Sequence, residues 1–353
     1  LTKDGKTLKE GVNGEVVIPP GVTMIGYRAF ADRDRLTKVT IPAGVEVIGW
    51  EVFYGCDGLV DVAIPGSVTD IGLRAFAICS RLMNISVDPG NKVYSSRNGM
   101  LLTKDGTTLI QGVNGEVEFP SCVRMIGTQA FEGCSGLTRL VIPDNVTNIA
   151  SRAFAYYRGL TDVMIPDDIQ FVGDDAFGNC GRLANVTIPI CLVERSSGYF
   201  GSEPRAGNVF NSTGIENATL AEGATTIGSY ALAWTFNDKT VPAHVTIPNS
   251  VTSICNGAFW YCPGLKSVAI PESVVSIGRD AFYDCGGLTE VTIPNSVTNI
   301  EAEAFPHCTS LGSVTVPACV LDIGLSDVFS GTTSITNVVL AEGVQNVAHD
   351  ALG

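Results

Sequence analysis

Positive charge is scarce in this sequence, and its scarcity argues against one class of partner. The 353 residues include 22 Lys and Arg against 36 Asp and Glu, giving a formal net charge of −14, and no basic run occurs. Proteins that bind nucleic acid present a concentrated positive face to the phosphate backbone. We therefore expect no nucleic-acid partner.

Long apolar runs, closely spaced cysteine pairs and histidine motifs are also missing. No run of 18 apolar residues suggests a membrane span, and no C-x₂-C pair suggests a zinc site. The only histidines are His244, His307 and His349, and none lies in a recognisable nucleophile motif. We expect no metal, no cofactor and no enzymatic activity.

Hydrophobic residues, glycine and proline are abundant instead. Hydrophobic residues make up 45% of the chain, and 39 glycines and 17 prolines are spread along it. This composition is too apolar for a disordered chain. It favours a folded protein in which many short strands are joined by tight turns.

A 23-residue repeat organises the sequence. Ile270–Cys285 and Ile293–Cys308 are near copies of one pattern, I-P-x-x-V-T-x-I-G-x-x-A-F-x-x-C-x-x-L-x-x-V-x. The apolar spacing fits neither one helix nor one alternating strand, so each copy is expected to form one coil of a solenoid with its apolar residues inside. Counting from the Ile, position 13 is phenylalanine in nine copies: Phe30, Phe53, Phe76, Phe131, Phe154, Phe177, Phe259, Phe282 and Phe305.

Each part of the repeat predicts a part of the coil. The segment L-x-x-V-x-I is β-branched and predicts the stacking strand, which proline then ends because it lacks a backbone donor. V-T-x-I predicts a second extended piece, and the following Gly predicts a bend. Ala-Phe is expected to form one turn of α- or 3₁₀-helix with Phe at the centre.

The pattern I-P-x-S-V-T-x-I-G-x-x-A-F-x-x-C-x-x-L resembles the leucine-rich repeat of the BspA-like surface proteins over nearly the whole chain. The resemblance implies a right-handed solenoid with a parallel β-sheet and no catalytic residues. It also implies a bacterial protein that is secreted or displayed on the cell surface. Some members of that family are adhesins for host matrix proteins or other cells.

We expect a single solenoid over residues 1–353, with two interruptions. Asn98-Gly99 and Asp105-Gly106 predict hairpin turns in an inserted β-hairpin that projects from the coils, and 190–208 is expected to be a polar loop of unassigned role. Residues 1–16 repeat 102–117, so the sequence begins in mid-motif and also ends inside a repeat. The expected segments are a partial hairpin element (1–17), repeats (18–87), the β-hairpin insertion (88–118), repeats (119–189), diverged coils with a loop (190–246) and repeats (247–353).

We interpret the cysteine at position 16 as a packed free thiol and not as a metal ligand, a disulfide or a catalytic group. Side chains stacked about 4.8 Å apart in parallel coils do not suit a disulfide, and Tyr157 and Arg33 replace cysteine in two coils. Free cysteine is among the most often buried residues. The seven cysteines at this position are Cys56, Cys79, Cys134, Cys180, Cys262, Cys285 and Cys308.

Aromatic residues at outward positions are the candidates for binding. In register they would form apolar patches, and aromatics are enriched at contact hot spots. For each one taken singly, covering an end of the hydrophobic core is the slightly more frequent role. The expected function is a non-enzymatic scaffold that binds a protein, such as a host matrix or cell-surface protein. A glycan-binding module and a structural spacer for a neighbouring domain remain open. The candidates are Tyr27 and Trp50 at position 10, Tyr54, Trp260 and Tyr283 at position 14, and Tyr156 and Tyr261 beside them.

Overall fold

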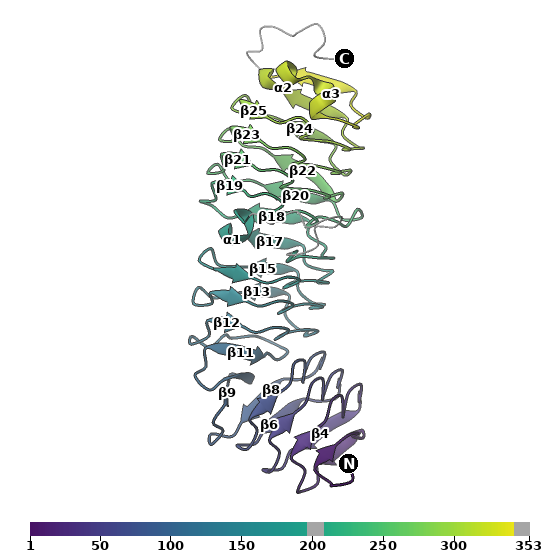
Figure 1. The fold of residues 1–353 in the computed structure, drawn as a ribbon, viewed down its shortest axis with the longest axis vertical. Coiled ribbons are helices and arrows are strands. Elements are labelled where there is room, and N and C mark those ends of the chain that lie inside the picture. The colour runs from purple at the N-terminus through teal and green to yellow at the C-terminus, as the bar shows by residue number, and fades with distance from the viewer. Residues whose placement is uncertain (196–207, 342–353) are drawn as a thin grey trace. The chain divides into compact units, whose positions relative to one another are not determined.

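The computed structural model describes residues 1–195 and 208–341, which form coils of a parallel β-solenoid (Figure 1). The predicted fold class is confirmed. The chain divides into two compact units, unit 1 with residues 1–160 and 170–181, and unit 2 with residues 161–169 and 182–353. Most of the loop expected within 190–208, and also His349, fall in 196–207 and 342–353, outside the described residues.

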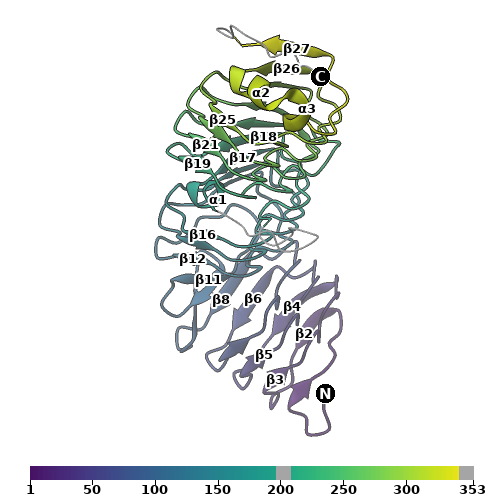
Figure 2. The same cartoon turned by 45° about the horizontal axis from the view of Figure 1, so that its top comes forward.

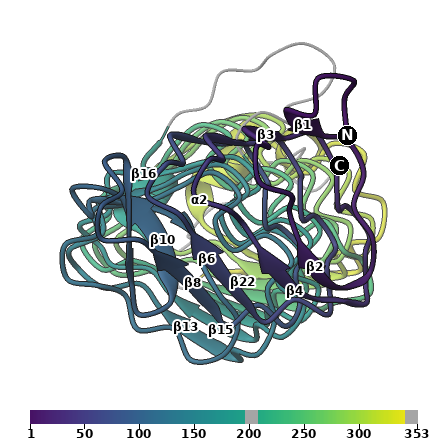
Figure 3. The same ribbon diagram turned by 90° about the horizontal axis from the view of Figure 1, so that it is seen from below.

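Unit 1 stacks its strands into parallel sheets on different sides of the coil, as the end-on view of Figure 3 shows for β1 and β3 against β2 and β4. The short strands of the first sheet are β1 (Thr7–Leu8), β3 (Met24–Ile25), β5 (Val47–Ile48) and β7 (Asp70–Ile71). The longer strands of the second are β2 (Gly14–Val17), β4 (Leu36–Thr40), β6 (Asp61–Ile64) and β8 (Asn84–Val87). The later strands of the unit are β9 (Tyr94–Arg97), β10 (Met100–Thr103), β11 (Thr108–Gln111), β12 (Met125–Ile126), β13 (Arg139–Val141), β14 (Asn148–Ile149) and β16 (Phe171–Val172).

Unit 2 repeats this arrangement, with its short strands β19, β21 and β25 along one edge in Figure 2. The short strands are β19 (Thr226–Ile227), β21 (Ser253–Ile254), β23 (Ser276–Ile277) and β25 (Asn299–Ile300). The longer strands are β15 (Asp162–Met164), β17 (Asn185–Ile188), β18 (Asn217–Leu220), β20 (Ala243–Thr246), β22 (Leu265–Ala269), β24 (Glu290–Thr292), β26 (Ser313–Val316) and β27 (Asn337–Leu340). The short helices are α1 (Ile190–Val193), α2 (Ala318–Ile323) and α3 (Leu325–Val328).

The two extended pieces expected in the repeat are strands in most coils, but the helices α1 and α2 follow the longer strands β17 and β26 instead. After β4, the Val45 N–H donates to the Pro42 carbonyl at 3.1 Å, which closes a turn directly after the strand. The Gly expected at the bend is required by a close approach between coils. A Cβ added at Gly49 would lie 2.9 Å from the Ile25 carbonyl oxygen of the preceding coil.

The Ala-Phe segments are successive hydrogen-bonded turns, and the short helices lie elsewhere, in the diverged coils. In the first coil, Ala29 N–H donates to Gly26 O at 3.2 Å and Arg33 N–H to Phe30 O at 3.2 Å. Phe30 N–H instead donates to the next coil, at Val52 O (2.9 Å). Alternate peptides thus close turns and stack coils, so this corner carries a hydrogen-bonded ladder of its own.

Two positions of each turn segment have left-handed backbone, whatever residue occupies them. Positive φ recurs at position 11, as in Arg28 (53°) and Glu51 (52°), and at position 15, as in Asp32 (58°) and Tyr156 (59°). Non-glycine residues seldom adopt this conformation without support from surrounding structure. The inter-coil hydrogen bonds of the turn segment supply that support.

Repeat phenylalanines form the interior of both units. In unit 1, Phe154 is fully buried between Phe131 and Phe177, with ring centroids 5.0 and 5.1 Å away and interplanar angles of 9° and 2°. In unit 2, Phe282 lies between Phe259 and Phe305 at 5.0 and 4.5 Å. The inward assignment of position 13 is confirmed.

The insertion between the repeats is confirmed as antiparallel, but the expectation that it projects from the coils is wrong. The Asn98-Gly99 turn joins β9 to β10, β10 pairs antiparallel with β11, and β11 continues parallel to β12. The side chains of 100–102 are buried. Asn91, also buried, donates to the carbonyls of Pro65 (3.0 Å) and Val68 (2.9 Å). The insertion is therefore part of the core.

Candidate binding surfaces

Position 10 of the first coils carries a line of exposed apolar side chains, here called the stripe: Tyr27, Trp50 and Leu73, which are 64%, 66% and 49% exposed. Arg28 N–H donates to Trp50 O at 3.1 Å, and Glu51 N–H to Leu73 O at 3.1 Å, so these hydrogen bonds hold the three residues in register. Sequence analysis placed Tyr27 and Trp50 here and missed Leu73.

Glycine makes room for the indole of the stripe. A Cβ added at Gly72 would lie 2.3 Å from Trp50 Cδ1. The ring therefore lies over the backbone of the next coil, where any larger residue would displace it. This contact restricts the indole while leaving most of its surface exposed.

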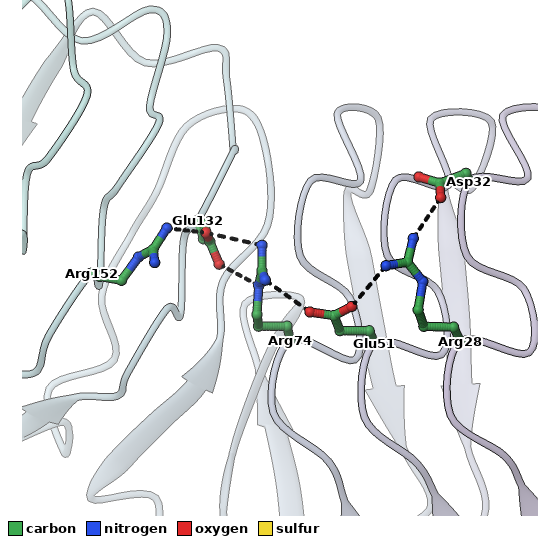
Figure 4. Close-up of polar contacts among 6 residues, drawn as sticks. All are labelled: Arg28, Asp32, Glu51, Arg74, Glu132 and Arg152. Atoms are coloured by element: carbon green, nitrogen blue, oxygen red, sulfur yellow. Dashed lines mark hydrogen bonds and ion pairs between the residues drawn. The ribbon is translucent and has the colours of Figure 1, made fainter.

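A network of charged side chains runs beside the stripe in unit 1 (Figure 4). Glu51 accepts from Arg28 at 3.4 Å and from Arg74 at 2.8 Å. Arg74 continues to Glu132 through two contacts of 2.9 and 3.2 Å, and Arg152 reaches Glu132 at 3.1 Å. The chain of alternating charges thus joins coils on both sides of the insertion.

Glu132 is the buried member of this network. Its side chain is fully buried, and burial raises the pKa of its carboxyl above the ordinary value, while the guanidinium groups of Arg74 and Arg152 oppose that rise. Sequence reasoning did not find this residue, because Arg74 lies 58 residues away and only the fold brings the two together.

Tyr54 and Tyr156 contact arginines of the same network. The Arg74 guanidinium carbon lies 4.7 Å from the centroid of the Tyr54 ring and that of Arg28 lies 5.6 Å from it. Arg152 lies 5.6 Å from the Tyr156 ring. Cation–π contacts of this kind stabilise the coil stack, so the structure gives both candidates an intramolecular role.

Unit 2 brings the other candidates together with aromatics that sequence analysis missed. Trp260 stacks on Tyr283, with centroids 4.2 Å apart and planes at 8°, and Tyr230 lies 6.3 Å from Trp260. His307 continues the row, with an edge contact to Tyr283 at 5.5 Å. We call Tyr230, Trp260, Tyr283 and His307 the aromatic row. The sequence could have revealed this row, because its members occupy positions 11, 14 and 15 of successive coils.

A second aromatic pair lies next to the row in the sequence. Trp234 packs on Tyr261 with centroids 3.9 Å apart and planes at 35°. Both residues have positive φ, 62° and 52°, and both occupy position 15 of their coils. Trp234 escaped notice because Leu232 replaces phenylalanine in its coil, which hides the repeat.

The position-16 cysteines are packed as expected. Each of six donates its thiol to a carbonyl oxygen of the preceding coil; Cys56 reaches Phe30 O at 3.1 Å and Cys79 reaches Phe53 O at 3.0 Å. Burial raises the pKa of Cys134, among others, to about 12. Where cysteine is absent, buried Tyr157 and the arginine Arg33 fill the place, and Arg33 Nε donates to Gly11 O at 3.2 Å.

His244 contacts a serine, a pairing that also occurs in catalytic sites. His244 Nδ1 lies 2.7 Å from Ser267 Oγ, and the two residues are cross-strand partners on β20 and β22. Within residues 1–195 and 208–341, no carboxylate contacts His244 to orient it as a base, and no cluster of potential metal ligands occurs. No helix in that part of the chain is long and apolar enough to cross a bilayer.

The stacked parallel strands and the buried residues at fixed repeat positions define a leucine-rich-repeat solenoid. Residues 12–100, 114–237 and 233–352 match the BspA type leucine rich repeat region, in 6 copies. The chain belongs to this family.

Solved structures of bacterial leucine-rich repeat proteins are similar to this chain. One from Bacteroides ovatus ATCC 8483 is 26% identical, with a TM-score of 0.53 over 95% of this chain and 84% of that chain. One from Eubacterium ventriosum ATCC 27560 is 22% identical, with a TM-score of 0.49 over 84% of this chain and 77% of that chain. A leucine rich cell surface protein from Faecalibacterium prausnitzii A2-165 is 23% identical, with a TM-score of 0.45 over 97% and 92%. No curated protein matches the sequence.

Proposed function

We propose that this protein is a non-enzymatic scaffold that binds other proteins, as an adhesin-type module secreted by a bacterium or displayed at its surface. Membership of the BspA type repeat family supports both the binding role and the location. The partner class proposed is a host matrix or cell-surface protein.

The stripe is the observation that carries this proposal. Three large apolar side chains are exposed in one line, held in register by inter-coil hydrogen bonds. Exposed aromatics on an ordered backbone lose little conformational freedom on binding, which favours affinity. The remaining candidates, Tyr54, Tyr156 and those of unit 2, stay predictions as partner contacts.

Binding to immobilised fibronectin, laminin and collagen would test the stripe. Truncating an energetically important interface residue costs more than about 1 kcal/mol, so the two truncations in the double variant Tyr27→Ser/Trp50→Ser are together expected to weaken binding at least about 30-fold. Both side chains are exposed, and circular dichroism should therefore be unchanged.

Phe171→Ser provides the matched control, because Phe171 is also an exposed aromatic of unit 1, at 52% exposure, and lies outside the stripe. Its binding should equal that of the wild type. Equal binding by the double variant and the wild type would show that the stripe is not the contact surface.

A further inference from the structure

The diverged coils of unit 2 contain a polar cavity of about 350 Å³. This volume lies near the lower end of the range of small-molecule sites, about 300–1,000 Å³. None of the lining side chains that the structure describes is charged. They are Asn208, Asn211, Ser212, Trp234 and Asn237.

Hydrogen bonds within the protein fix the wall of this cavity. Asn208 Nδ2 donates to Trp234 O at 3.1 Å, and Asn208 Oδ1 accepts from Phe210 N–H at 3.0 Å. Asn208 therefore ties 208–212 to the segment that carries Trp234. Tyr261 packs on the Trp234 ring and holds it in place.

Other polar groups of the cavity are left available. Within residues 1–195 and 208–341 the Asn237 amide makes no hydrogen bond, while Asn211 uses only its oxygen, which accepts from Ser212 Oγ at 3.4 Å. The amides of both residues therefore keep donors and acceptors for a ligand.

The charge nearest in sequence is engaged elsewhere. Asp238 follows Asn237, but its carboxylate accepts from the Thr240 N–H at 2.9 Å and from Thr240 Oγ1 at 2.6 Å, and these bonds lower its pKa. The Asp238 carboxylate thus stabilises the turn from Asp238 to Thr240. The described lining therefore offers no counter-charge to an ionic ligand.

We propose that this cavity binds a neutral saccharide. Asparagine amides both donate and accept, which matches hydroxyl groups that do the same. The tryptophan supplies an apolar surface for the C–H face of a sugar ring. A wholly apolar ligand would leave the amides unpaired. This binding site lies in unit 2 and does not depend on the stripe of unit 1.

Titration of the full chain with single sugars, followed by saturation-transfer NMR, tests the assignment. The neutral probes are glucose, galactose, mannose, N-acetylglucosamine and lactose, set beside glucuronate and triglycine amide. At least one neutral sugar should bind. Asn237→Ala should lower its affinity at least tenfold, while Asn249→Ala, which changes an exposed asparagine outside the cavity, should leave it unchanged.

Trp234→Phe is the second variant, because it keeps a ring against Tyr261 but offers the sugar a smaller apolar face. It should lower the affinity at least threefold, with an unchanged circular dichroism spectrum. The proposal is overturned if no neutral sugar binds the wild type or if either cavity variant binds as tightly as Asn249→Ala. Preference for glucuronate or for triglycine amide would overturn it as well, since the ligand would then be an anion or a peptide.

Discussion

Replacing Phe154 with alanine tests whether the column of stacked rings holds the coils of unit 1 together. Phe154 is fully buried, with a ring on each side at about van der Waals stacking distance. Burial and the resulting cavity set the cost of Phe→Ala at about 3–5 kcal/mol. The two ring contacts, each contributing about 0.5–1.5 kcal/mol, raise the cost for this variant above the lower end of that range, to about 4 kcal/mol.

Thermal unfolding followed by circular dichroism measures this cost. For a folding unit of 150–250 residues, 1 kcal/mol lowers the melting temperature by about 2–4 °C, so Phe154→Ala should lower it by roughly 8–16 °C. Phe30→Ala is the graded comparison, because Phe30 is equally buried but, among the residues that the structure describes, stacks on Phe53 alone. It should cost less, by about one aromatic pair.

Phe171→Ala is the control for the loss of an aromatic residue as such. Phe171 is half exposed, and its truncation should change the melting temperature by only a few degrees. If Phe154→Ala melts within 2 °C of Phe171→Ala, the phenylalanine column does not stabilise the stack, and the reasoning from ring contacts is wrong.

The remaining predictions concern thiols and one carboxyl group. At pH 8 Ellman's reagent should react with no more than the four partly exposed cysteines, Cys122, Cys191, Cys255 and Cys319, until urea is added. A buried thiol with a pKa of about 12, such as that of Cys134, forms roughly 10³-fold less thiolate than a thiol with a pKa of 9. Fast reaction of a fifth thiol in the folded protein would contradict the packing. Burial raises the pKa of Glu132, so the folded state holds that proton more tightly than the unfolded state does, and stability falls as pH rises from about 4.3 through the folded pKa. Urea unfolding of wild type and Glu132→Gln between pH 4 and 7 should therefore show wild type losing stability relative to the variant as pH rises; the opposite trend would mean that Arg74 and Arg152 outweigh burial.

Much of the coil could be predicted because its buried residues recur at a fixed spacing. Position 13 was predicted to be inward, since that placement buries the phenylalanine of the repeat. The end of β4 before Pro42 was also predictable, because proline lacks a backbone donor. The insertion was misjudged because hairpin turns say where strands reverse and not where they pack. The run Met100-Leu101-Leu102 was the signal that this hairpin belongs to the core.

The charge network lay beyond sequence reasoning for a different reason. It requires left-handed backbone at position 11. Arg28 and Glu51 do not predict that conformation, because neither residue type favours it. It also requires Glu132 to meet Arg74 across the whole insertion. Both conditions are set by the stacking of coils and not by local preference.

The left-handed positions explain how one repeat can present different chemistry in different coils. Because inter-coil hydrogen bonds fix the backbone at positions 11 and 15, the side chains there are free to vary without loss of the coil. Position 11 carries Arg28 in unit 1, and position 15 carries Trp234 beside the polar cavity of unit 2, on backbones with φ of 53° and 62°. Substitution of Trp234 should thus change what the surface binds far more than how stably the unit folds, whereas a substitution at position 13 should do the reverse.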